Sequence, residues 1–224
     1  MTTIAVVIPV RDGAAYLAEC LASVLKQTLA PCAVLVVDDG SQDDSAEIAR
    51  QHGGLVQVHR QAARGAGAAR NAGIDGTVST HVAFLDADDV WEPHALAALA
   101  AGIGASDMVH GLVTHFVSPD LPTDQSALRV VPEGPLPALS PGGMLFTRRV
   151  LELVGPQRID VQVGEFIDWY ARATELGMTT AVVDAVVVRR RVHARNTGTL
   201  RRASRVDLVR VVRETLQRRQ GIPG

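Results

Sequence analysis

Short apolar runs alternate with amphipathic segments through the first half of the chain, and this alternation constrains the fold more than any other feature. The mainly apolar runs, each of strand length, occupy residues 4–8, 33–37, 55–59 and 82–85. The segments between them that are expected to be helical occupy residues 14–27, 43–52, 66–76 and 92–103. Continuous apolar runs are typical of strands that are buried on both faces of a sheet. The pattern therefore predicts an α/β fold, with an open, mostly parallel sheet flanked by helices.

The alternation weakens after residue 104, although further elements are expected. Strand-like runs lie at 107–117 and 180–188, and helical periodicity returns at 147–154, 164–177 and 200–219. Six prolines between residues 118 and 143 predict mostly loop or short edge strands there. We divide the chain into residues 1–104, residues 105–199 as the second half of the same domain, and a basic amphipathic C-terminal helix at 200–224.

Composition and charge narrow the class of protein. Hydrophobic residues make up 47% of the 224 residues, which argues against a disordered chain, and no apolar run approaches the roughly 18 residues of a membrane span. The N-terminus has no basic region before its apolar run, so we expect no signal peptide and a cytoplasmic protein. Residues 1–188 hold 22 acids and 11 bases, whereas residues 189–224 hold 11 arginines and two acids, so an acidic body carries a basic tail. We expect no nucleic-acid partner.

Acidic side chains follow three of the expected strands. Asp12 comes after the first strand, Asp39 ends the second, and an Asp-Ala-Asp-Asp run at 86–89 follows the fourth. Parallel sheets bind ligands beyond the carboxyl ends of their strands, and carboxylates gathered there repel one another unless a cation lies between them. Oxygen ligands suit Mg²⁺ or Mn²⁺, which usually share their coordination shell with substrate phosphates. For Asp38, a role as a helix cap or turn former is the alternative.

Five short motifs resemble those of family 2 glycosyltransferases, which have a GT-A fold. They are VIPV at 7–10, SVLKQT at 23–28, VVDDGS at 36–41, AARNAG at 68–73 and FLDADD at 84–89. Looser matches follow, with GGMLFTRR at 142–149, the segment 165–172 and RVH at 191–193. The order and spacing of the first five motifs make the resemblance specific over roughly residues 4–100.

The resemblance implies a binding site for a nucleoside diphosphate sugar in residues 1–104, at the carboxyl edge of the sheet. By similarity, Pro9, Val10 and Arg11 line the base and ribose. Asp39 accepts a hydrogen bond from the base, and Arg70 contacts the base or the phosphates. Uridine is the expected base, with guanosine and thymidine as alternatives.

The resemblance also implies a metal-dependent transfer that inverts the anomeric carbon. Asp86, Ala87 and Asp88 form the D-x-D motif, in which Asp86 faces the ribose or sugar and Asp88 binds the metal. His193 is a second expected ligand of the Mn²⁺ or Mg²⁺ ion, because neutral imidazole binds metals well. The metal would offset the negative charge that grows on the departing diphosphate.

A carboxylate must take the proton of the acceptor hydroxyl in such a reaction. Relatives often carry a Glu-Asp pair seven and six residues before an arginine on the corresponding helix. Here Glu165 fits the first position relative to Arg172, but Phe166 occupies the second. Asp168 lies three residues after Glu165 on the same helical face, so Asp168 or Glu165 is the expected base, with Asp168 preferred. A structural ion pair of Asp168 with Arg172 is the alternative.

Two alternative functions and two readings of the C-terminal helix stay open. A sugar nucleotidyltransferase would be expected to have a glycine-rich loop with arginine and lysine after the first strand, but residues 9–13 hold one glycine and no lysine. A non-catalytic nucleotide-sugar-binding module is suggested by Phe166. The helix at 200–219 has two interpretations. It contacts a membrane surface peripherally, or it packs its valines on its own domain or in a homodimer. We prefer packing or dimerisation. The acceptor is an unidentified hydroxyl compound.

Overall fold

The structure is a computed structural model that describes residues 2–121, 131–193 and 202–220. Its strands are β1 (Ile4–Val10), β2 (Ala33–Asp38), β3 (Val56–Arg60), β4 (His81–Phe84), β5 (Val90–Trp91), β6 (Met108–Val117), β7 (Leu136–Pro137), β8 (Met144–Thr147) and β9 (Thr180–Val192). Its helices are α1 (Leu17–Leu25), α2 (Ser45–Gln51), α3 (Ala66–Asp75), α4 (Ala95–Gly102), α6 (Arg148–Val154), α7 (Glu165–Glu175) and α9 (Arg202–Arg219). Most lie within a few residues of the segments that the sequence predicts.

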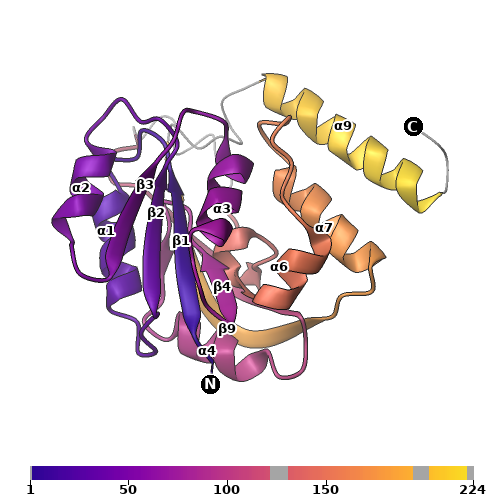
Figure 1. The fold of residues 1–224 in the computed structure, drawn as a ribbon, viewed down its shortest axis with the longest axis horizontal. Helices are drawn as coiled ribbons and strands as arrows, with labels where there is room; N and C mark the ends of the chain where they lie inside the picture. Colours follow the sequence, from indigo (N-terminus) through magenta and orange to yellow (C-terminus); the bar gives the residue numbers. More distant parts are fainter. Residues whose placement is uncertain (1, 122–130, 194–201, 221–224) are drawn as a thin grey trace.

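One open sheet joins all the described strands, in the order β3-β2-β1-β4-β8-β6-β9-β5, with β7 paired to β6 (Figure 1). The pairs β3-β2, β2-β1 and β1-β4 are parallel, as are β6 and β9. Strand β8 runs antiparallel to both of its neighbours, β4 and β6. The predicted open α/β sheet flanked by helices is thereby confirmed, with a mixed rather than uniform direction in its second half.

Two apolar cores lie on opposite faces of the sheet. The alternating residues Ile4, Val6, Ile8 and Val10 of β1 face the core that is formed with α1, α2 and α4. Val7 faces the other core, which β1 forms with α3, α6 and α7. Every residue of β1 is buried, as expected for an apolar strand covered by helices on both faces.

Helix α3 packs unusually close to β1. A Cβ atom on Gly73 of α3 would lie 2.1 Å from Cγ1 of Val7, so only glycine allows this approach. The close packing fixes α3, and with it the Ala-Ala-Arg-Asn motif, against the central strand of the sheet.

The sequence pattern missed strands β8 and β5, began α4 too early and ended β9 too soon. Strand β8 occupies the apolar run 144–147, which is too short to show a period. Strand β5 has only two residues, and α4 begins at Ala95 rather than at 92. The expected strand at 180–188 extends to Val192, so that β9 carries the RVH motif back to the carboxyl edge of β4.

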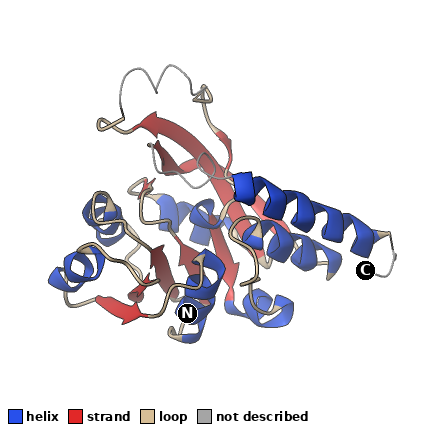
Figure 2. Cartoon of the chain, turned by 90° about the horizontal axis from the view of Figure 1, so that it is seen from above, coloured by secondary structure: helices blue, strands red, loops and turns tan. Residues whose placement is uncertain are grey.

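Helix α9 lies alongside α7 at one side of the molecule (Figure 2). It buries Val211 and Thr215, whereas the predicted apolar face, formed by Val206, Val209, Val212 and Leu216, is 43–67% exposed. The expectation that these valines pack on their own domain is therefore wrong, because the opposite face of α9 makes that contact. A homodimer and a peripheral membrane contact stay predictions. Within the described residues, no helix combines the length and the hydropathy that crossing a bilayer requires.

Candidate active site

The order of the strands reverses at the carboxyl end of β1, and the region there between β1 and its neighbours β2 and β4 is called the crevice. The chain leaves β1 toward β2 on one side and returns to β4 on the other, which is the arrangement where open α/β sheets bind ligands. The loops after β1 and β2 are joined there by hydrogen bonds. The backbone N–H groups of Asp12 and Gly13 donate to the hydroxyls of Ser41 and Ser45, at 3.0 and 2.9 Å, and Gln42 N donates to Asp12 Oδ1 at 2.7 Å. One wall of the crevice is thus held before any ligand binds.

The predicted contacts of the base and ribose lie at this wall. Pro9 and Val10 are buried at the end of β1, and Arg11 is exposed just beyond it. Val10 and Ala87 both lie close to Gly13, since a Cβ atom there would be 2.7 Å from Val10 Cγ2 and 3.6 Å from Ala87 Cβ. The structure therefore brings Val10 and the middle residue of the D-x-D motif together from two neighbouring strands.

Asp39 organises the loop that leads into α3. Its Oδ1 accepts hydrogen bonds from Gln61 Nε2 at 2.7 Å and Arg64 N at 2.9 Å, and its Oδ2 accepts one from Gly65 N at 2.7 Å. A carboxylate can accept about four hydrogen bonds, so these bonds leave room for the predicted bond from a base. The neighbouring Asp38 accepts a bond from Ser41 N at 2.8 Å, which confirms its role as a turn former.

Arg70 bridges two carboxylates that lie 79 positions apart in the numbering. Its NH2 group lies 2.8 Å from Asp86 Oδ1, and its NH1 group lies 2.8 Å from Glu165 Oε1. Burial disfavours the charge on Arg70, but the two carboxylates outweigh this effect and raise its pKa. The structure thus joins the D-x-D motif, the AARNAG motif and the start of α7 in one group at the crevice.

The second aspartate of the D-x-D motif meets His193. His193 Nε2 lies 2.9 Å from Asp88 Oδ2, and the His193 ring lies 4.6 Å from the ring of Tyr16. Asp89, next in the chain, is buried and accepts a bond from Arg191 N at 2.9 Å. Burial raises the pKa of Asp89, and the charges of Asp88 and Asp86 raise it further.

Arg191 belongs to the RVH motif, but the sequence alone assigned it no role in this site. Its buried guanidinium donates to the backbone oxygen of Asp88 at 3.0 Å and to Glu19 Oε2 at 2.5 Å. It also lies 4.9 Å from the ring centre of Tyr16 and 4.6 Å from that of Phe116. Arg191 therefore fixes the turn that carries Asp88. Its burial next to an acidic run is a tertiary feature that the sequence does not display.

Asp88 and His193 are suitable ligands for part of a divalent metal site. The Asp88 carboxylate and the His193 imidazole lie 2.9 Å apart, and both atom types bind Mn²⁺. Within residues 2–121, 131–193 and 202–220, no cluster of three or more His, Cys, Asp or Glu side chains could hold a metal ion. The donor set thus fits an ion that takes its other ligands from substrate phosphates and water.

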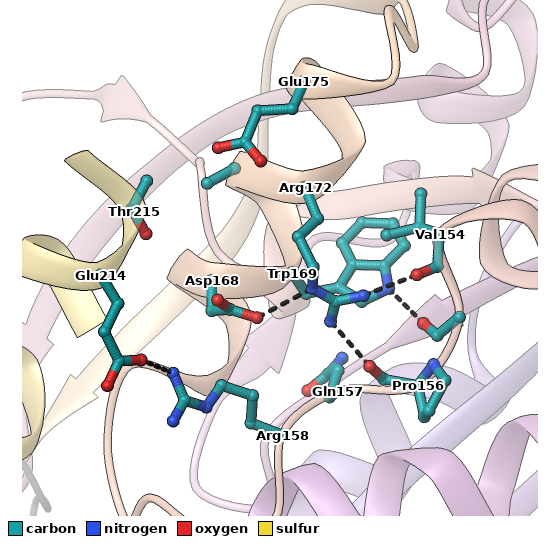
Figure 3. A network of polar contacts seen from close by, with 12 residues as sticks. Val154, Pro156, Gln157, Arg158, Asp168, Trp169, Arg172, Glu175, Glu214 and Thr215 are labelled. Carbon is teal, nitrogen blue, oxygen red and sulfur yellow. Dashed lines mark hydrogen bonds and ion pairs between the residues drawn. The ribbon is translucent and has the colours of Figure 1, made fainter. Parts of the chain in front are cut away.

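Asp168 lies in a different environment from Glu165, although both belong to α7. Its side chain, only 3% exposed, accepts a bond from Arg172 Nε at 2.9 Å (Figure 3). Its Oδ1 also lies 3.0 Å from NH1 of Arg218 on α9. The alternative reading of Asp168, an ion pair with Arg172, is therefore confirmed. Helix α9 also contacts this carboxylate, and which of Asp168 and Glu165 is the base stays a prediction.

Residues 5–152 match the sequence profile of glycosyl transferase family 2. The chain belongs to this family. This family 2 chain is 39% identical over 116 residues to the uncharacterized glycosyltransferase alr2836 of Nostoc sp., covering 50% of this chain and 36% of the relative. It is 37% identical over 114 residues to a PGL/p-HBAD biosynthesis glycosyltransferase of Mycobacterium bovis, covering 47% of this chain and 44% of the relative. The matches thus span less than half the length of these curated relatives.

Solved structures of low sequence identity show the same fold as this family 2 chain. Residues 1–349 of S. aureus TarS, in complex with UDP-GlcNAc, superpose with a TM-score of 0.76 at 20% identity, over 95% of this chain and 65% of that chain. The mannosyltransferase PcManGT of Pyrobaculum calidifontis, in complex with GDP-Man and Mn²⁺, gives a TM-score of 0.72 at 20% identity, over 96% of this chain and 64% of that one. The GT-A-like fold implied by the sequence motifs is thereby confirmed.

Proposed function

We propose that this chain transfers a sugar from a nucleoside diphosphate sugar to a hydroxyl acceptor, with inversion at the anomeric carbon. The observation that carries the proposal is the Arg70 bridge, because it joins Asp86 of the D-x-D motif to a carboxylate on the opposite helix, Glu165. An inverting displacement needs both parts in one crevice, a binding edge for the diphosphate and a carboxylate for the incoming hydroxyl.

A uridine diphosphate sugar is the proposed donor. Pro9, Val10 and Arg11 lie at the end of β1, and Asp39 is available to one further donor, as a base N–H would require. TarS, which shares the fold, is in complex with UDP-GlcNAc, and PcManGT is in complex with GDP-Man. Guanosine is therefore the first alternative base.

Glu165 is the proposed general base. Its side chain is 13% exposed and lies against Gly67 at the start of α3, on the crevice side of α7. Phe166, at the position where relatives often carry aspartate, packs instead in the core, 6.2 Å from Phe146 between ring centres. Glu165 is thus the carboxylate of α7 that is linked to the D-x-D motif, through Arg70.

Mn²⁺ or Mg²⁺ is the proposed cofactor, with Asp88 and His193 as its protein ligands. The ion would offset the charge that develops on the departing diphosphate. Arg191 and Tyr16 contribute by holding the turn at Asp88 and the ring of His193 in position. The presence of Mn²⁺ with GDP-Man in PcManGT supports this assignment.

Thermal unfolding with nucleotide sugars tests the proposal directly. A ligand at about 100 times its Kd adds about 2.7 kcal/mol to stability, which raises Tm measurably. We expect UDP-sugars with Mn²⁺ to raise Tm more than GDP- or dTDP-sugars, and Asp88→Asn to lose the part that depends on Mn²⁺. No shift with any of these nucleotides would overturn the proposal. A shift without transfer to any hydroxyl acceptor would instead favour the non-catalytic binding module.

A further inference from the structure

We propose that Asp168 is a positioning residue for the crevice: through Arg172 and the segment 154–157, it holds Gln157 against Arg70. This inference rests on the proposed function, because it explains how the Arg70 bridge keeps its geometry. It gives Asp168 a part in the reaction other than proton transfer.

Arg172 connects Asp168 to the segment that follows α6. The guanidinium of Arg172 uses three of its N–H groups in three directions (Figure 3). Nε donates to Asp168 Oδ2 at 2.9 Å, NH1 to Val154 O at 2.6 Å and NH2 to Pro156 O at 2.7 Å. A planar guanidinium can satisfy all three acceptors only in one orientation, and the carboxylate of Asp168 selects that orientation.

Residues 154–157 are held by hydrogen bonds from both α7 and α3. Trp169 Nε1 donates to Gly155 O at 2.8 Å, so α7 holds the three consecutive carbonyl oxygens of residues 154–156. Asn71 holds the next residue from the other side. Gln157 N donates to Asn71 Oδ1, and Asn71 Nδ2 donates to Gln157 O, both at 2.9 Å. The segment is thus clamped between α7 and α3.

The side chain of Gln157 contacts Arg70. The side chain of Gln157 is buried, and its Oε1 lies 3.5 Å from NH1 of Arg70, the same nitrogen that contacts Glu165. Nε of Arg70 is buried without a hydrogen-bond partner among the described residues. Gln157 therefore adds an uncharged acceptor beside a buried cation whose hydrogen bonding is incomplete. Moving it would let Arg70 tilt away from Glu165.

An isosteric, uncharged replacement of Asp168 separates positioning from proton transfer. Asn in place of Asp168 keeps an oxygen that can accept the bond from Arg172 Nε, but it cannot act as a base. We expect Asp168→Asn to lower kcat by less than about tenfold and to leave the pH dependence of kcat unchanged. Glu165→Gln should lower kcat by about 100-fold or more, which is the usual contribution of a general base. The exposed Asp184→Asn on β9 serves as the matched control and should equal the wild type.

Gln157 offers a second test, in which Gln157→Leu removes the contact with Arg70 without altering any charge. We expect Gln157→Leu to lower kcat several-fold without moving the pH profile, and Gln157→Glu to change that profile by adding a carboxylate beside Arg70. The loss in Asp168→Asn and Gln157→Leu should be non-additive, because both act on Arg70 through one segment.

The activities of these variants decide whether Asp168 acts by positioning. A loss of kcat in Asp168→Asn as large as in Glu165→Gln, together with loss of the acidic limb of the pH profile, would make Asp168 the base and overturn it. Full activity of Gln157→Leu, or strictly additive losses, would overturn the route through residues 154–157. A wild-type chain that binds no nucleotide sugar would instead remove the proposed function, and the positioning role with it.

Discussion

His193 Nε2 lies 2.9 Å from Asp88 Oδ2, although 105 residues separate the two in the chain. The contact exists because β9 continues to Val192 and delivers His193 to the turn after β4. Two side chains of suitable chemistry thus meet at the edge where the diphosphate is proposed to bind.

Removal of either side chain should weaken metal binding. Replacement of outer-shell partners of metal sites typically costs about 10- to 100-fold in affinity, so loss of a direct ligand should cost at least as much. We expect His193→Ala and Asp88→Ala to lower the affinity for Mn²⁺, measured by calorimetry in the presence of UDP, by about tenfold or more. His59→Ala, an exposed histidine on β3, is the control. Equal Mn²⁺ affinity in all four proteins would argue against this site.

The Arg70 bridge should depend on the shape of the guanidinium as well as on its charge. Lysine cannot contact Asp86 and Glu165 with a planar fork, so Arg70→Lys leaves at least one carboxylate contact of this buried cation unmade. We expect a loss of about 1–3 kcal/mol in the free energy of unfolding in urea, as for other unsatisfied buried groups. Transfer activity should fall with it. Unchanged stability and activity in Arg70→Lys would show that charge alone is sufficient.

The close approach of α3 to β1 should make Gly73 intolerant of a methyl group. The added Cβ would meet Cγ1 of Val7 at 2.1 Å, and overpacking of this kind costs about 1–3 kcal/mol. Gly142→Ala is the matched control, because its Cβ would meet no atom closer than 3.8 Å. We expect chemical denaturation to show a loss in Gly73→Ala that is clearly larger than in Gly142→Ala. Similar losses in both would contradict this packing.

Asp107 should contribute stability that depends on pH. Its carboxylate accepts bonds from Thr179 N at 3.0 Å and Arg149 NH1 at 2.8 Å, and these contacts, led by the bond from Thr179, lower its pKa below the ordinary 3.8. Because the folded-state pKa is the lower one, the stabilisation is fully present above the unfolded value and is lost as pH falls through the folded value.

Comparison with Asp107→Asn isolates this contribution from the other carboxylates. We expect the variant to unfold about 1 kcal/mol more easily than the wild type at pH 7, as for a lost hydrogen bond. The difference should shrink as the pH falls below about 4, the range of an unperturbed aspartate. A difference that is the same at pH 7 and pH 3 would assign the effect to packing rather than to ionisation.

Local patterns predicted the first half of the fold well. Strands β1, β2 and β4 are apolar runs that are almost entirely buried, so their composition alone marks them. Strand β3 lies at the edge of the sheet and alternates, with Val56 buried and Gln57 and His59 exposed. Strand β8 was missed because three apolar residues and a threonine before a helix have no period that distinguishes them from the helix itself. The outward face of α9 was misjudged because a sequence shows an apolar stripe but not which side meets the protein.

The sequence by itself determined the α/β class, the family motifs and the aspartates at the carboxyl edge, since these depend on neighbours in the chain. Only the tertiary structure separated Glu165 from Asp168, which lie three residues apart on one helix. Helix α3 packs beside Glu165 and brings Arg70 to it, whereas α9 packs on the other flank of α7 and brings Arg218 to Asp168. The surroundings of a carboxylate, and hence its chemistry, are set by elements distant in the chain, which no local spacing records.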